Sequence, residues 1–196
     1  MIIVDVELSG LDAEKDSIVS IGAIDFSNPK NQFYGECKIW EGAHISDEAL
    51  AINGFTKSQI QDPKKQNDEE LIKSFISWAL ACPEHTFAGQ NPYLDVLFIR
   101  NGAKRYHLDW PFAARTIDQH TICYTHMVKK GIIPPVLNNR TDLDSDKIMK
   151  YVGIPIEPHP HNALNGAKVA GEAISRLLYD KTLIPEFKGY PIPWIT

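Results

Sequence analysis

The segment from Ile2 to Leu8 is apolar and β-branched except for two carboxylates, Asp5 and Glu7. Such a run predicts a buried strand, and side chains two residues apart on a strand point to the same face. The two carboxylates therefore lie side by side, which repulsion and desolvation make costly unless a cation shares the site. Hard divalent ions such as Mg²⁺ or Mn²⁺ prefer carboxylate oxygens. The pattern indicates a metal site, and an edge strand with a solvated face is the alternative.

Strands dominate the first part of the chain, and helices and strands are mixed after it. Besides 2–8, we expect strands over 17–26, 32–40, 86–90 and 116–122. From helical spacing, acidic first turns and terminal proline or glycine, we expect helices over 47–53, 68–82, 92–104, 144–152 and 162–179. This order predicts a single α/β domain over residues 1–184, with a mixed sheet of about five strands flanked by helices. We expect the proline-rich tail, residues 185–196, to pack on that domain.

Composition narrows the class of protein. The 196 residues include 20 Lys and Arg against 25 Asp and Glu, which gives no support to a basic surface that coats nucleic acid. The widely spaced Cys37, Cys82 and Cys123 form no C-x-x-C pair, which argues against a disulfide framework or a zinc site. No apolar run approaches the roughly 18 residues of a membrane span, and no signal peptide is recognisable, so we expect a cytoplasmic protein. The sequence has no heptad repeat that requires a homo-oligomer, so it leaves the oligomeric state open.

Two further residues are candidates for chemistry. Asp95 stands in the first turns of the helix expected over 92–104, where favourable interaction with the helix macrodipole is an alternative explanation. His161 precedes the last expected helix, and a histidine there can take a proton from a metal-bound water near neutral pH. A surface histidine that caps the helix is the alternative.

Together these segments resemble the DEDDh group of 3′→5′ exonucleases, which includes RNase T and the proofreading subunit of the bacterial replicative polymerase. The family's first motif, D-x-E on the first strand, is matched by Asp5 and Glu7. Its second, N-x-x-x-D-x-x-F-[LI], is matched by Asn91, Asp95, Phe98 and Ile99. Its third, H-x-A-x-x-D-A, is matched by His161, Ala163 and Ala167. The resemblance covers residues 1 to about 180 and implies the RNase H-like exonuclease fold.

The resemblance also implies roles for the matched residues. Asp5, Glu7 and Asp95 would hold two divalent ions, Mg²⁺ or Mn²⁺, at the scissile phosphate, and His161 would be the general base. The 3′-terminal nucleotide would lie beside the first strand. Its expected contacts are Leu8, Ser9, Gly10, Asn91 and Phe55. For Phe55 we expect base stacking, with a core phenylalanine as the alternative.

One position departs from the family pattern. The fourth carboxylate falls five residues after the histidine, where this chain has Gly166. The next acids along the helix, Glu172 and Asp180, are too far away to replace it, and the amide of Asn165 is a poorer ligand. We therefore expect one ion to bind weakly and the activity to be low, absent or dependent on Mn²⁺.

The function that the resemblance implies is release of nucleoside monophosphates from the 3′ ends of single-stranded DNA or RNA, or from short oligonucleotides. The alternative is a catalytically dead exonuclease module that binds nucleic acid or a protein partner. Four of the five active-site residues are present, which favours an enzyme impaired at Gly166. A different two-metal nuclease of the wider RNase H-like fold is disfavoured because His161 marks the exonuclease branch.

Overall fold

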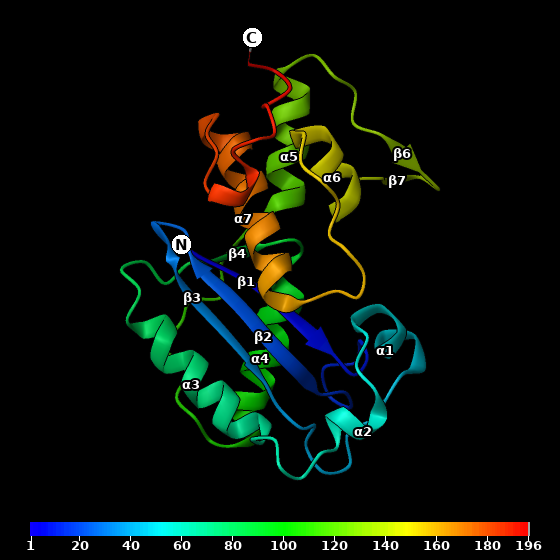
Figure 1. Cartoon of the computed structure of the whole chain (residues 1–196), viewed down its shortest axis with the longest axis vertical. Coiled ribbons are helices and arrows are strands. Elements are labelled where there is room, and N and C mark those ends of the chain that lie inside the picture. Colours follow the sequence, from blue (N-terminus) through cyan, green and yellow to red (C-terminus); the bar gives the residue numbers. More distant parts are fainter. Residues whose placement is uncertain (196) are drawn as a thin grey trace.

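A five-stranded sheet with the order β3-β2-β1-β4-β5 organises the fold (Figure 1). The computed structural model describes residues 1–195. The sheet is made of β1 (Ile2–Leu8), β2 (Ile18–Asp25), β3 (Asn28–Glu36), β4 (Phe87–Gly89) and β5 (Thr116–Asp118). The first three strands are antiparallel, whereas β4 runs parallel to β1 and to β5. The sheet is therefore mixed, as the sequence predicts.

Helices and short elements complete the chain. The helices are α1 (Asp47–Asn53), α2 (Lys57–Ile60), α3 (Asp68–Leu80), α4 (Pro92–Arg105), α5 (Gln119–Lys129), α6 (Ser145–Val152) and α7 (Ala163–Tyr179). A two-stranded hairpin joins β6 (Val136–Leu137) to β7 (Arg140–Thr141), and a 3-10 helix spans Pro185–Phe187. Figure 1 shows the hairpin standing away from the sheet, on the same side of the molecule as α1.

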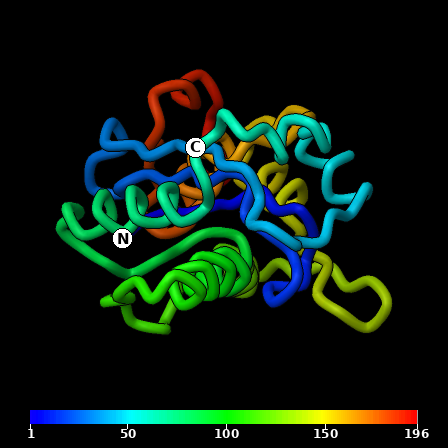
Figure 2. The backbone as a smooth tube through the Cα atoms, turned by 90° about the horizontal axis from the view of Figure 1, so that it is seen from below, coloured from blue at the N-terminus to red at the C-terminus, as the bar shows by residue number. Residues whose placement is uncertain are grey.

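Alternate residues of β1 pack against two different layers of helices, one on each face of the sheet. Ile2 and Val4 pack in one core with apolar side chains of α3 and α4, whereas Ile3 packs on the opposite face with Ala170 and Ile174 of α7. Figure 2 shows α3 and α4 below the sheet and the C-terminal helices above it. Residues 5 and 7 share the parity of Ile3, so the two carboxylates of β1 lie on the side of α7.

A buried ion pair ties the C-terminal tail to α7. Arg176 and Glu172 are both fully buried, and Arg176 Nε donates to Glu172 Oε1 at 2.6 Å. The other guanidinium N–H groups bond the carbonyls of Val152, Phe187, Tyr190 and Pro191. The second oxygen of Glu172 accepts the N–H groups of Leu183 and Ile184, both at 2.8 Å. Because every group is bonded, the buried charges hold the tail in one place.

Two of the expected strands are corrected by the structure. The strand expected over 116–122 ends at Asp118, whose side chain accepts the N–H of His120 and begins α5. The β-branched Thr121 and Ile122 suggest a strand, but this N-cap starts a helix instead. The third strand spans Asn28–Glu36 instead of 32–40. It begins earlier because a tight turn joins it directly to β2, and it ends at Glu36.

Cysteine pairing and membrane crossing can also be compared with the structure. Cys37, Cys82 and Cys123 are free thiols, and all three are buried. Over residues 1–195, no helix combines the length and the apolar character needed to cross a membrane.

Candidate active site

The two carboxylates of β1 lie where the sheet opens between β1 and β4. β1 pairs with β2 along its whole length, but β4 accompanies it only at Ile2 and Ile3. Beyond Ile3, the edge of β1 is free to meet the first turns of α4. The end of β1 therefore presents both side chains and backbone donors to one place.

Asp95 uses one of these backbone donors. Its Oδ1 accepts the N–H of Val6, which lies between Asp5 and Glu7, at 3.0 Å. Asn91 precedes the helix in the left-handed conformation, with φ 50° and ψ 49°, and this turns the first residues of α4 toward β1. Asp95 is 7 % exposed. The structure thus brings together the three carboxylates that the first two motifs supply.

Burial and mutual repulsion disfavour the charged forms of these carboxylates. Burial, reinforced by the charges of Asp95, Glu7 and Glu157, raises the pKa of Asp5 well above its usual value. Burial together with the charges of Glu157 and Asp95 raises the pKa of Glu7 to about 8. Burial also raises the pKa of Asp95 to about 7, although the hydrogen bond from Val6 opposes this shift.

The first turns of α7 cover the carboxylates from the other side. α7 contacts the sheet at Gly22, the β2 residue paired with Asp5. A Cβ atom on Gly22 would lie 2.1 Å from the backbone of Ala163 and Leu164, so only glycine allows this approach. One turn further, a Cβ atom on Gly166 would lie 2.4 Å from Asp5 Oδ2. Position 166 therefore faces the carboxylates, but Asp5 fills the space that a side chain there would need.

The loop before α7 carries His161 and a carboxylate that the sequence analysis missed. The backbone N–H of His161 bonds the carbonyl of Ile52 in α1 at 3.1 Å, and its ring stacks on His159 with centroids 4.6 Å apart. Glu157, four residues earlier, is partly buried, and its Oε1 accepts the N–H of Asn162 at 3.2 Å. Its charge raises the pKa of both Asp5 and Glu7. The only sequence signal that could have identified Glu157 is its position, an acid four residues before the motif histidine His161.

A cavity of about 300 Å³ adjoins the carboxylates. Asp5, Glu7 and Asp95 line it together with three expected nucleotide contacts, Leu8, Gly10 and Asn91. α1 and the residue before it add Ser46, Glu48, Ile52 and Asn53, to which the sequence analysis gave no role. The side chain of Asn53 donates to the carbonyl of Leu8 at 3.0 Å and so fixes α1 against the end of β1.

Two expected nucleotide contacts lie outside the lining of this cavity. Ser9 is fully buried, and its hydroxyl donates to the carbonyl of His44 and accepts the N–H of Ser17, both at 2.8 Å. Phe55 is partly buried in a cluster with Leu50 and Ile60. Neither side chain is among those that line the cavity.

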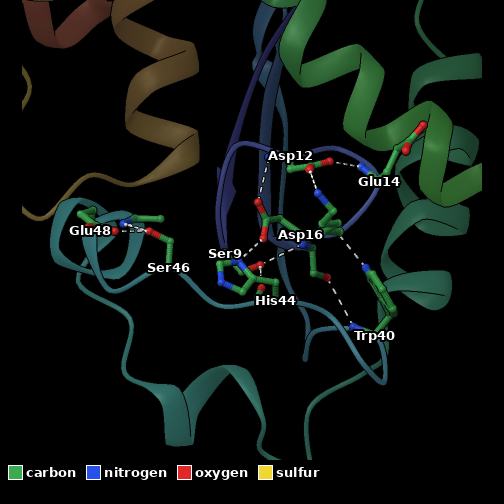
Figure 3. Close-up of polar contacts among 11 residues, drawn as sticks. Ser9, Asp12, Glu14, Asp16, Trp40, His44, Ser46 and Glu48 are labelled. Atoms are coloured by element: carbon green, nitrogen blue, oxygen red, sulfur yellow. Dashed lines mark hydrogen bonds and ion pairs between the residues drawn. The ribbon is translucent and has the colours of Figure 1, made fainter.

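A buried carboxylate shapes the loop that follows β1 (Figure 3). Asp16, 4 % exposed, accepts the N–H of Asp12 at 2.8 Å, and its other oxygen lies 2.9 Å from Nδ1 of His44. A Cβ atom on Gly10 would lie 2.3 Å from this carboxylate, so glycine lets the loop close over Asp16. The network thereby holds Gly10 and Leu11 at the mouth of the cavity.

The chemistry of the donor set suits hard divalent cations. Carboxylate oxygens are the preferred ligands of Mg²⁺ and Mn²⁺, and a cation would remove the repulsion that raises these pKa values. Over the residues that the structure describes, no three His, Cys, Asp or Glu side chains already stand in a metal-holding arrangement.

A mixed sheet with carboxylates at the end of its central strand, an acid from α4 and a histidine before the last helix defines the exonuclease class of the RNase H-like fold. The chain matches the exonuclease family model RNase_T over residues 2–173, and it belongs to that family. The DEDDh-type resemblance and the RNase H-like fold expected from the sequence are thereby confirmed at the level of family and fold. Exonucleases of this type generally use divalent metal ions.

Individual relatives are distant. The PolC-type DNA polymerase III of Caldanaerobacter subterraneus subsp. tengcongensis is 23% identical over 177 residues, which are 90% of this chain and 11% of the polymerase. The nuclease domain of 3′hExo, a DEDDh family member bound to rAMP, superposes with a TM-score of 0.69 at 16% identity, covering 93% of each chain. Exonuclease I of E. coli in complex with a 5cy-dT13 oligonucleotide superposes with a TM-score of 0.70 at 19% identity. The match covers 91% of this chain and 41% of that chain. This chain thus spans about a tenth of the polymerase and two fifths of exonuclease I.

Proposed function

We propose that this chain is a metal-dependent 3′→5′ exonuclease that releases nucleoside monophosphates from single-stranded DNA or RNA ends, or from short oligonucleotides. The observation that carries the proposal is the convergence of Asp5, Glu7 and Asp95 on a cavity at the end of β1. Family membership supports it, and so do structural neighbours solved with rAMP and with single-stranded oligonucleotides.

In this proposal Asp5, Glu7 and Asp95 would hold two divalent ions, Mg²⁺ or Mn²⁺. When bound, such ions polarise the scissile phosphate and lower the pKa of the attacking water. His161 accepts the proton of that water as general base. The terminal nucleotide lies in the cavity against Leu8, Gly10 and Asn91, the expected contacts that line it.

Gly166 determines how active the chain is. With three family carboxylates and no replacement for the fourth, one ion would bind weakly and turnover would be low. A replacement carboxylate would preserve both ions. Metal binding and activity therefore have to be measured on the same protein.

Digestion of 5′-labelled single-stranded DNA and RNA, with Mg²⁺ or Mn²⁺, tests the proposal. We expect the wild-type chain to produce a ladder that shortens from the 3′ end, and Asp5→Asn to abolish it. Glu41→Gln, an exposed loop position away from the cavity, is the matched control. The comparison of DNA with RNA also gives the sugar preference.

The proposal fails if the wild-type chain and Gly166→Asp are both inactive although folded. Metal-free oligonucleotide binding that Asp5→Asn leaves unchanged would then identify a binding module. Activity gained only in Gly166→Asp would instead identify an exonuclease impaired by its glycine.

A further inference from the structure

This inference rests on the proposed function and concerns the carboxylate that replaces the missing acid at position 166. With Asp5 in its present position there is no room for a side chain at position 166, because a Cβ atom on Gly166 would lie 2.4 Å from Oδ2 and 2.8 Å from Cγ of Asp5. An aspartate at position 166 would have to displace Asp5. While Asp5 keeps its present position, a fourth carboxylate has to come from another element.

Glu157 is held beside the first turn of α7 by its own hydrogen bond. Its Oε1 accepts the N–H of Asn162 at 3.2 Å. Asn162 is itself the N-cap of α7, since its side chain accepts the N–H groups of Leu164 and Asn165. Among the residues described, the second oxygen of Glu157 accepts no hydrogen bond. One carboxylate oxygen thus fixes the side chain, and the other is available as a ligand.

Glu157 lies on the same side of the sheet as the carboxylates that a side chain at position 166 would face. Its hydrogen-bond partner Asn162 directly precedes Ala163, whose backbone packs on Gly22, the β2 residue paired with Asp5. Among the neighbouring charges, that of Glu157 has the largest effect on Glu7, ahead of Asp95, and it also acts on Asp5. Asn162 additionally donates to the hydroxyl of Tyr34 on β3 at 3.2 Å, which anchors this end of the loop to the sheet. Glu157 therefore approaches Asp5 and Glu7 from the α7 side of the sheet.

No lysine or arginine compensates these charges. Within residues 1–195, none of Asp5, Glu7, Asp95 and Glu157 forms a salt bridge to either residue type. Two other buried acids of this chain are paired with arginine, namely Glu172 with Arg176 and Asp68 with Arg105. The imidazoles of His159 and His161 are the basic groups near Glu157, and with no lysine or arginine bonded to the four carboxylates a divalent cation is the group that can balance them.

We propose that Glu157 supplies the fourth carboxylate of the metal centre, from the loop before α7 instead of from α7 itself. The ligand set is then Asp5, Glu7, Asp95 and Glu157, and Gly166 provides the space in which Asp5 turns. The number of acids is the same as in the family pattern, and only the element that delivers the last one differs.

Titration calorimetry with Mn²⁺ tests this assignment without relying on activity. We expect two Mn²⁺ ions per wild-type chain, and we expect Glu157→Gln to lose one of them or to bind it about 10- to 100-fold more weakly. Glu157→Asp should bind the ion more tightly than Glu157→Gln, because it keeps a carboxylate. Glu41→Gln, which removes an exposed carboxylate outside the site, should match the wild type.

Thermal unfolding of each variant without metal separates a ligand effect from misfolding. Glu157→Gln should melt no lower than the wild type, because it removes one charge from a repelling group. Unchanged affinity for two ions in Glu157→Gln, together with lost binding in Asp5→Asn, would overturn the assignment of Glu157 and leave the proposed function standing. Binding unaffected by Asp5→Asn would refute the proposed function itself, and this inference with it.

Discussion

Raising the pH should destabilise the metal-free protein through the carboxylates of β1. Burial and the charges of Glu157 and Asp95 raise the pKa of Glu7 from 4.5 to about 8. An unfolded chain releases this proton near the lower value, whereas the folded chain retains it to about pH 8. Between these two values the folded state binds more protons, so the free energy of unfolding falls as pH rises. The contribution of Glu7 to the free energy of unfolding is fully present below a pH of 4.5, and it is fully lost above about pH 8.

The magnitude follows from the size of this pKa difference. At about 1.4 kcal/mol for each tenfold change in proton affinity, the charge on Glu7 costs about 5 kcal/mol at high pH. Burial raises the pKa of Asp95 to about 7, and the charge of Asp95 already contributes to the shift of Glu7, so the two titrations are coupled and their contributions are not added. A domain of this size loses about 2–4 °C in Tm per kcal/mol, which predicts a fall of about 10–20 °C across the window.

Thermal unfolding in a chelating buffer, from about pH 5 to about pH 9, measures this slope. Glu7→Gln carries no charge and should flatten the curve, whereas Glu41→Gln should keep the wild-type slope. Mg²⁺ or Mn²⁺ should raise Tm most at high pH, where the carboxylates are charged. A wild-type curve that is flat or rises over this range, or one that Glu7→Gln leaves unchanged, would refute the electrostatic reasoning.

Three further substitutions test the packing around the site. Gly166→Asp should displace Asp5 and weaken Mn²⁺ binding by at least about tenfold in calorimetry, and tighter binding would contradict the fit described for this glycine. Gly22→Ala should push α7 from the sheet and lower the free energy of unfolding in urea by about 1–3 kcal/mol; an unchanged midpoint would contradict the close contact. Arg176→Met should cost about 3–5 kcal/mol in the same assay because it leaves Glu172 charged and buried, whereas replacing both by apolar residues should cost less.

Local signals in the sequence were sufficient for most of the sheet. Apolar, β-branched strands at 2–8 and 17–26 are fixed by burial on both faces, which leaves a strong composition signal. β5 and α5 were mispredicted because the same segment contains β-branched residues and a helix N-cap at Asp118, and their balance depends on tertiary contacts. The side chain of Asp118 also accepts the N–H of Asn91 from a neighbouring loop, which no local pattern reveals.

The site was predictable to the extent that its residues fall in motifs. Asp5, Glu7, Asp95 and His161 have fixed spacings to apolar neighbours, so they stand out in one sequence. Glu157 does not, because its place beside Asp5 and Glu7 depends on the path of a loop between α6 and α7. Loop residues are positioned by the elements that they connect, and a sequence read locally does not contain that placement.

Two glycines, Gly22 and Gly166, determine how much space surrounds the carboxylate of Asp5. Gly22 lets the backbone of α7 touch the sheet, and this contact brings position 166 against the Asp5 carboxylate. At that separation the volume between β1 and α7 admits the side chain of Asp5 or one from position 166, but not both in their present positions. A carboxylate that enters from the loop, as Glu157 does, avoids this conflict because it reaches Asp5 and Glu7 without needing a Cβ atom on the contacting turn of α7.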